Sequence, residues 1–190
     1  MNILIVEDEI LLGLLLIDTL ADVGHRALGP ASCRSEALGL VAERTPHLAF
    51  VDIELRGGES GIELAAELRR RGVACVFATG QPGLAREHRE LALGLIAKPY
   101  SPLTILEVVG YFEALGAGER RPRMPRGLEL FGLADAPIPA SRIDTSPPAA
   151  IPCASPGLLG TAPAPGIAAD LPPQPDQRLG DPGVLEAVTG

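Results

Sequence analysis

LAFVDIELRGGESG, residues 48 to 61, is the most informative stretch of this sequence. Apolar residues from Leu48 to Val51 lead directly into Asp52, and the chain then passes through a pair of glycines. An apolar run of this length, bounded by turn residues, predicts a buried strand. A carboxylate at the end of a buried strand costs free energy unless it is paired, hydrogen-bonded or bound to a cation. We therefore expect other parts of the fold to bring partners to Asp52.

Four further segments of strand length accompany this one, and stretches of helical length separate them. They are NILIV at 2 to 6, RALGP at 26 to 30, VACVF at 73 to 77 and GLIA at 94 to 97. This alternation predicts βα units and a parallel sheet. Ser60 with Glu63 forms a capping box, and Ser101 precedes Pro102, so both serines predict helix starts. The predicted fold is α/β, a doubly wound, five-stranded parallel sheet of (βα)5 topology.

Proline divides the chain of 190 residues into two parts. Residues 1 to 115 contain five prolines and residues 116 to 190 contain the other 14 of the 19. Frequent proline among Ala and Gly interrupts helices and sheets before a core can form. We predict a domain at 1 to 115 and a disordered Pro-rich tail at 116 to 190. Truncation after Gly118 is then expected to leave stability nearly unchanged, although the arginine-rich segment 119 to 126 could contact the acidic domain.

Composition argues against several classes of function. The net charge of −8 disfavours nucleic acid as a ligand. Cys33, Cys75 and Cys153 are odd in number and widely spaced, which predicts neither a disulfide framework nor a metal site. The apolar run from Ile10 to Ile17 is too short to span a membrane. We expect a cytoplasmic protein that binds no membrane.

Reactive side chains follow four of the five predicted strands. Glu7 and Asp8 follow the first, Asp52 the third, Thr79 the fourth and Lys98 the fifth. Parallel strands end at one edge of the sheet, where ligands of open α/β folds bind. Three acids in one pocket repel one another unless a cation is present, and this donor set suits Mg²⁺. The sequence therefore predicts a magnesium site at this edge.

The remaining two residues predict the chemistry of the site. Lys98 supplies a positive charge for a phosphoryl group, and the hydroxyl of Thr79 can donate to one of its oxygens. Phosphoryl transfer needs mainly positioning and charge compensation. Asp52 is the best candidate nucleophile because it lies centrally and glycines follow it.

Together ILIVEDE, LAFVDIELRGGESG, VFATG and LIAKPYS resemble a response-regulator receiver domain of two-component signalling, across residues 1 to about 115. The resemblance implies that the predicted sheet has the flavodoxin-like, CheY-like fold of that family. The resemblance implies that Asp52 is the phosphoacceptor. It also implies that Glu7 and Asp8 hold Mg²⁺ together with Asp52 and the backbone carbonyl of Glu54.

The same resemblance assigns contacts with the phosphoryl group to Thr79 and Lys98, and implies a cis peptide bond between Lys98 and Pro99. Receivers commonly carry an aromatic residue three positions before the lysine, where this chain has Leu95. The stretch from Phe77 to Gly80 resembles the FATGUY subgroup of alphaproteobacterial single-domain regulators, which also lack that aromatic residue. Gly80 could let the loop after the fourth strand move instead.

Partners follow from the resemblance as well. It implies a histidine kinase, with the HWE type as one candidate, or a phosphotransfer protein as the phosphoryl donor. A downstream protein target would be reached by contact, and the regulator would be a monomer or weak dimer that phosphorylates itself without being a turnover enzyme. The first helix carries more leucines than one buried face needs, so Leu11, Leu14 or Leu15 is expected to face outward and contact the kinase.

Two alternatives remain open. Asp52-Ile53-Glu54 resembles the Asp-x-Asp pair of haloacid-dehalogenase-like phosphatases, although Glu54 replaces the second aspartate and the domain is short. The chain could also be an interaction module independent of phosphorylation, or a sink that drains phosphate from another pathway.

Overall fold

The computed structural model describes residues 1 to 132, and the predicted tail from residue 133 onward lies outside the described residues. Strands and helices alternate along the described chain. They are β1 (Asn2–Val6), α1 (Ile10–Asp22), β2 (Arg26–Ala31), α2 (Arg34–Glu43), β3 (Leu48–Val51), α3 (Gly61–Arg70), β4 (Ala74–Thr79), α4 (Pro82–Glu87), β5 (Gly94–Ala97), α5 (Pro102–Gly116) and β6 (Leu128–Leu130). All five predicted strands are present.

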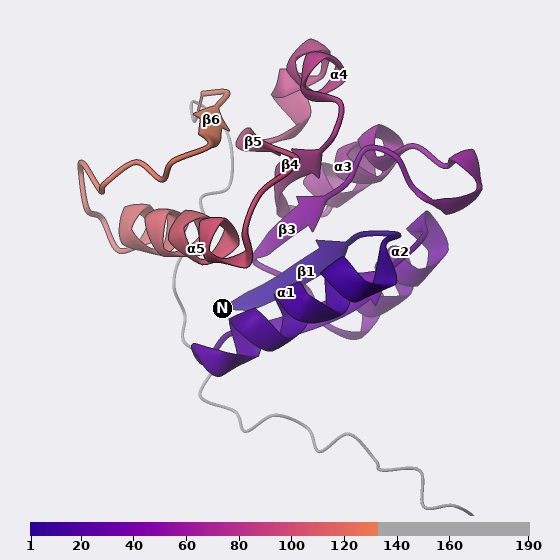
Figure 1. Cartoon of the computed structure of the whole chain (residues 1–190), viewed down its shortest axis with the longest axis horizontal. Helices are drawn as coiled ribbons and strands as arrows, with labels where there is room; N and C mark the ends of the chain where they lie inside the picture. The colour runs from indigo at the N-terminus through magenta and orange to yellow at the C-terminus, as the bar shows by residue number, and fades with distance from the viewer. Residues whose placement is uncertain (133–190) are drawn as a thin grey trace, which may run out of the picture. The chain divides into compact units, whose positions relative to one another are not determined.

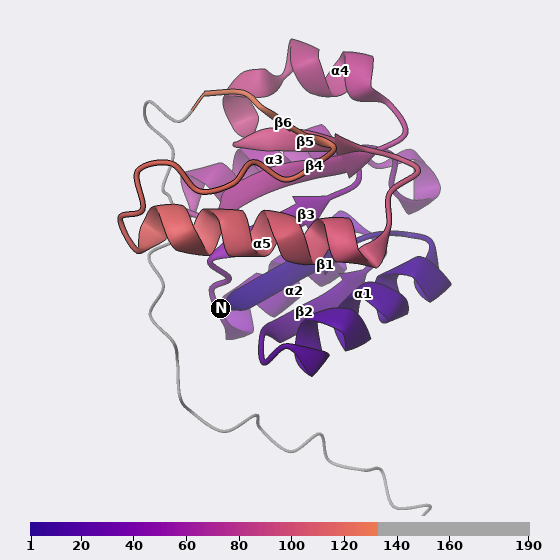
Figure 2. The same cartoon turned by 60° about the vertical axis from the view of Figure 1, so that its left-hand side comes forward.

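The strands form one six-stranded sheet in the order β2-β1-β3-β4-β5-β6. The first five are parallel, as predicted, while β6 pairs antiparallel with β5. The chain winds first toward β2 and then back through β3, β4 and β5. Figure 1 shows β1, β3, β4 and β5 in this order, and all six strands are labelled in Figure 2. This reversal of strand order next to β1 is the switch point at which open α/β sheets bind their ligands.

Helices cover both faces of the sheet, as Figure 2 shows, with α1 and α5 on one face and α2 and α3 on the other. β3 illustrates the division. Leu48 and Phe50 belong to the apolar cluster that includes residues of α1 and α5, and Ala49 and Val51 belong to the cluster that includes residues of α2 and α3. Burial on both faces explains why β3 and β4 are continuously apolar rather than alternating.

Both predicted helix starts are confirmed. The Ser60 side chain accepts a hydrogen bond from the backbone N–H of Ile62 at the start of α3, and the Ser101 side chain accepts from Thr104 at the start of α5. Among residues 1 to 132, no helix is both long and apolar enough to cross a membrane.

β6 requires a correction to the predicted boundary at residue 115. Residues 128 to 130 were assigned to a disordered tail, but they join the sheet: Leu128 pairs with Ile96 and Leu130 with Gly94. Leu128 is only 9 % exposed and packs in the α1 and α5 cluster. A three-residue strand lying close behind two prolines is too short to give a periodic signal in the sequence. Pairing with the edge of β5 stabilises it instead.

Candidate functional site

The ends of β1, β3 and β5 bring two carboxylates, Glu7 and Asp52, together with one ammonium group, that of Lys98. The ammonium nitrogen of Lys98 lies 2.7 Å from Oδ2 of Asp52 and 2.7 Å from Oε2 of Glu7. The side chains of Glu7 and Asp52 are 2 % and 8 % exposed. The buried acid at the end of β3 therefore has the partner that its position required.

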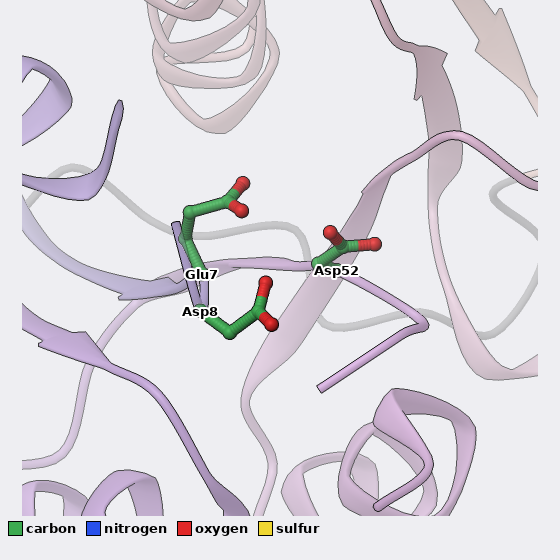
Figure 3. A group of neighbouring side chains, drawn as sticks. All are labelled: Glu7, Asp8 and Asp52. Atoms are coloured by element: carbon green, nitrogen blue, oxygen red, sulfur yellow. The ribbon is translucent and has the colours of Figure 1, made fainter. Parts of the chain in front are cut away.

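Asp8 completes an acidic group with Glu7 and Asp52. Each of the three residues offers a carboxylate oxygen, and these oxygens lie within 4.8 Å of one another. Figure 3 shows the carboxylates of Asp8 and Asp52 on opposite sides of a common space, with Glu7 beside them. Clustered carboxylate oxygens without His or Cys are a donor set that suits Mg²⁺. The residues that the sequence assigned to a metal thus fit that ion.

Burial and charge act against each other on the titration of this pocket. Burial raises the pKa of Glu7 and the neighbouring Asp52 adds to this, while the hydrogen bond from Lys98 opposes it. Burial lowers the pKa of Lys98, but its hydrogen bonds to Asp52 and Glu7 outweigh that effect and raise it. Lys98 is consequently a permanent cation, and one cation faces more negative charge than it can neutralise.

Thr79 lies where the sequence placed it, at the last position of β4 and fully buried. The register of the sheet pairs Val51 with Phe77, so Asp52 and Thr79 follow at neighbouring strand ends. The hydroxyl oxygen of Thr79 accepts a hydrogen bond of 3.1 Å from the backbone N–H of Gln81. This bond connects the site to the first residue before α4.

The loop after β3 holds Asp52 through the backbone. The N–H of Glu54 donates to Oδ1 of Asp52 at 3.3 Å, and Glu54 pairs with Ser60 in an isolated bridge. The structure thus brings Glu54 next to Asp52, and its carbonyl as a metal ligand stays a prediction. Gly61, which the sequence did not single out, starts α3 so close to Asp52 that a Cβ would overlap the carbonyl oxygen of Asp52. The one sequence feature that could have pointed to Gly61 is its position directly after Ser60, the predicted start of a helix.

Tyr100 is a second residue that the sequence did not single out. Together with Glu9, Leu12, Lys98 and Pro99 it lines a cavity of about 380 Å³ beside the site. Burial raises the pKa of its hydroxyl, with the nearby charge of Glu7 as a further cause. The hydroxyl is buried and has no hydrogen-bond partner in the described part of the chain. The preceding Lys98–Pro99 bond is cis, as the resemblance implied.

Leu95 occupies the position where the resemblance led us to look for an aromatic residue. It lies in β5, is 2 % exposed and packs in the cluster on the α2 and α3 side of the sheet. In the antiparallel pairing of β5 with β6 its partner is Glu129.

Comparisons with known proteins agree with this geometry. The family model described as "Response regulator receiver domain" matches residues 3–110. The phyllosphere-induced regulator PhyR of Methylorubrum extorquens is 36 % identical over 112 residues, which cover 57 % of this chain and 42 % of that protein. The chain thus matches less than half the length of this curated relative.

Solved structures give the same result. The receiver domain of PhyR from Erythrobacter litoralis is 30 % identical with a TM-score of 0.54, and the match covers 65 % of this chain and 95 % of that one. The receiver domain of NtrX from Brucella abortus is 28 % identical with a TM-score of 0.53, covering 57 % and 94 %. The resemblance to the FATGUY subgroup stays a prediction. Because the family model spans more than half of the chain and the acids, threonine and lysine occupy the expected strand ends, the chain belongs to the response regulator receiver domain family.

Proposed function

We propose that this protein accepts a phosphoryl group on Asp52 from a histidine kinase or a phosphotransfer protein, and then signals through protein contacts. The observation that carries the proposal is the contact of Lys98 with Asp52 at 2.7 Å within a group of three acids, of which Glu7 and Asp52 are buried. Receiver domains serve two-component signalling, so the family supports the same role. The relative in Methylorubrum extorquens is named a regulator, which agrees with a regulatory output.

In the proposed reaction a carboxylate oxygen of Asp52 attacks the phosphorus of the donor. The bond from phosphorus to the donor atom breaks, and the donor leaves with that electron pair. Lys98 then moves from the carboxylate to one oxygen of the new acyl phosphate. The hydroxyl of Thr79 donates a hydrogen bond to a second phosphoryl oxygen. Glu7, Asp8, Asp52 and the Glu54 carbonyl would hold Mg²⁺ here, and the bound ion would offset the negative charge of the phosphoryl oxygens.

Labelling with a small phosphodonor tests this assignment. The full chain is incubated with Mg²⁺ and acetyl phosphate, and its intact mass is measured. We expect one phosphoryl group per chain, and none in Asp52→Asn. Asp22→Asn, at an exposed position at the end of α1, is the matched control and should be labelled normally. Equal labelling of Asp52→Asn and the unmodified chain would refute the assignment.

A haloacid-dehalogenase-like phosphatase is the competing enzymatic function. In such an enzyme the second acid of Asp52-Ile53-Glu54 would act beside the first, but the side chain of Glu54 is exposed here and the acids beside Asp52 come from the end of β1. We therefore infer that the protein is not a turnover enzyme. Sustained hydrolysis of phosphate monoesters by the purified chain would show the opposite.

The kinase-binding surface is assigned to α1. Leu11 is 79 % exposed, and Leu14 and Leu15 are about half exposed, while Leu16 and Leu20 are buried. An exposed apolar cluster of this kind marks a contact site. Leu11→Glu should fold normally and accept phosphate from acetyl phosphate, but accept it slowly from phosphorylated kinases of the source organism. Leu16→Glu, on the buried side, should unfold the domain. Normal kinase transfer to Leu11→Glu would place the kinase elsewhere.

A further inference from the structure

β6 is an edge strand that the chain folds back onto β5 after α5. Only three residues, Leu128 to Leu130, form it, and the amide of Phe131 adds a 2.9 Å hydrogen bond to the carbonyl of Leu93. Figure 2 shows β6 beside β5, in agreement with their antiparallel pairing. Gly94 permits this approach, because a Cβ there would overlap the carbonyl oxygen of Glu129.

The two faces of β6 are held differently. Leu128 and Leu130 pack in the cluster with residues of α1 and α5. On the opposite face Glu129 accepts a bidentate ion pair from Arg86 of α4, with Nε at 3.0 Å and Nη2 at 2.8 Å from the carboxylate oxygens. Glu129 is the cross-strand partner of Leu95, and directly paired residues of antiparallel strands share a face. The position at which receivers commonly carry an aromatic residue is therefore flanked by the Arg86–Glu129 pair.

This attachment is weak by construction. The strand is short, and the Arg86 and Glu129 side chains are 52 % and 44 % exposed. Exposed ion pairs contribute little to stability, and short edge segments open well below the free energy of global unfolding. Leu128 and Leu130 hold β6 by apolar packing, and the ion pair adds a small further stabilisation. Loss of the pair therefore raises the frequency at which β6 opens, without by itself detaching the strand.

A continuous set of contacts joins β6 to the end of β4. The hydroxyl of Thr79 accepts from the N–H of Gln81, Gln81 precedes the six-residue helix α4, and α4 carries Arg86. If the Thr79 side chain rotates toward a phosphoryl group on Asp52 so that its oxygen moves away from Gln81, the Gln81 N–H loses its partner. Gly80 lies exposed between the two residues, and a Cβ there would meet nothing within 4 Å. Gly80 therefore has no side chain that packs between the site and the start of α4.

We propose that β6 is a strap loosened by phosphorylation: in the unphosphorylated protein the Arg86–Glu129 pair adds to the packing of Leu128 and Leu130 in holding β6 on β5, and movement of α4 breaks the pair and makes opening of the strand more frequent. The inference rests on the proposed phosphorylation of Asp52. Opening uncovers the edge of β5 and the side of Leu95, which gives the protein a phosphorylation-dependent surface without an aromatic switch residue. An uncovered strand edge can accept an extended segment of a partner protein.

Hydrogen exchange of the full chain tests the strap. The amides of residues 129 to 131 are followed with and without Mg²⁺ and acetyl phosphate, and the intact mass of each sample reports its phosphorylation. We expect exchange of these amides to rise about tenfold on phosphorylation, within the ordinary range of coupling between two sites. Asp52→Asn treated in the same way should show no rise.

Variants of the ion pair separate the strap from the phosphorylation itself. Arg86→Gln should exchange rapidly at β6 before phosphorylation and gain little from it, and Arg86→Glu combined with Glu129→Arg should restore slow exchange. Arg71→Gln, which removes an exposed partner of Glu67 on α3, is the matched control and should behave like the unmodified chain. A labelled protein with unchanged β6 exchange, or slow exchange in Arg86→Gln, overturns the strap while the proposed function stands. Absence of labelling overturns both.

Discussion

Lys98 and Arg86 both form ion pairs with carboxylates, but the two sets of pairs differ in their exposure to solvent. Lys98 lies at the carboxyl ends of the central strands, between two acids with little exposure to solvent. Arg86 lies at the sheet edge, and half of its side chain is in solvent, as is nearly half of Glu129. Water screens the second pair and hardly reaches the first. The buried pair is therefore an obligatory part of the pocket, and the exposed pair is suited to being broken and remade.

The largest effect on stability is expected from removing Lys98, the partly buried cation between two buried acids. Lys98→Gln leaves Glu7 and Asp52 in the pocket with no positive partner, and breaking a buried pair in this way costs about 3 kcal/mol of unfolding free energy. Urea denaturation measures the loss.

Mg²⁺ should return most of that stability to Lys98→Gln, because a bound cation offsets the same charges. The recovery should be smaller in Asp8→Asn combined with Lys98→Gln, since that chain has lost one predicted ligand. A Lys98→Gln protein as stable as the original without Mg²⁺ would show that the pocket does not need its lysine.

The second largest effect concerns β6. Truncation after Gly118 removes Leu128 from the core and should lower the unfolding free energy by about 2 kcal/mol, the contribution of one buried leucine. Truncation after Gly132 keeps β6 and is the matched control. Equal urea midpoints for the two truncations would mean that β6 adds nothing to stability, as the sequence alone suggested.

A smaller effect is expected from the exposed pair. Arg86→Gln should change the urea midpoint far less than Lys98→Gln does, because most of the Arg86–Glu129 attraction is already screened by solvent. Raising the salt concentration should erase what difference remains, while leaving the Lys98→Gln effect in place. A large, salt-independent loss of unfolding free energy in Arg86→Gln would show that solvent does not screen the Arg86–Glu129 pair.

The smallest effect concerns His25, a partly buried imidazole near the amino group of Met1 and Glu113. Burial lowers the pKa of His25, Glu113 opposes this, and the amino group of Met1 adds to it. Because the folded protein binds the proton less readily than the unfolded chain does, stability should fall as the pH drops below the ordinary histidine value of about 6.5. His25→Gln should flatten that slope in urea titrations at several pH values. If the pH dependence of stability is unchanged in His25→Gln, a group other than His25 causes it.

The sequence by itself determined the parallel sheet and the positions of its functional residues. Continuous apolar runs predicted strands buried on both faces, and reactive side chains directly after Val6, Val51 and Ala97 had to converge because parallel strands end at one edge. These strands could be predicted because the pattern that marks each of them lies within a few consecutive residues.

Other features depend on contacts between segments that are far apart in the chain, and only the folded structure shows them. Gly61 matters because α3 begins against the backbone of Asp52, and Gly94 because β6 runs beside it. Leu11 faces outward while Leu16 is buried, although the helix sequence is apolar on both sides. β6 itself has no pattern long enough to predict. Its place comes from pairing with an edge more than thirty residues earlier in the chain, and such long-range contacts leave no periodic trace in a sequence.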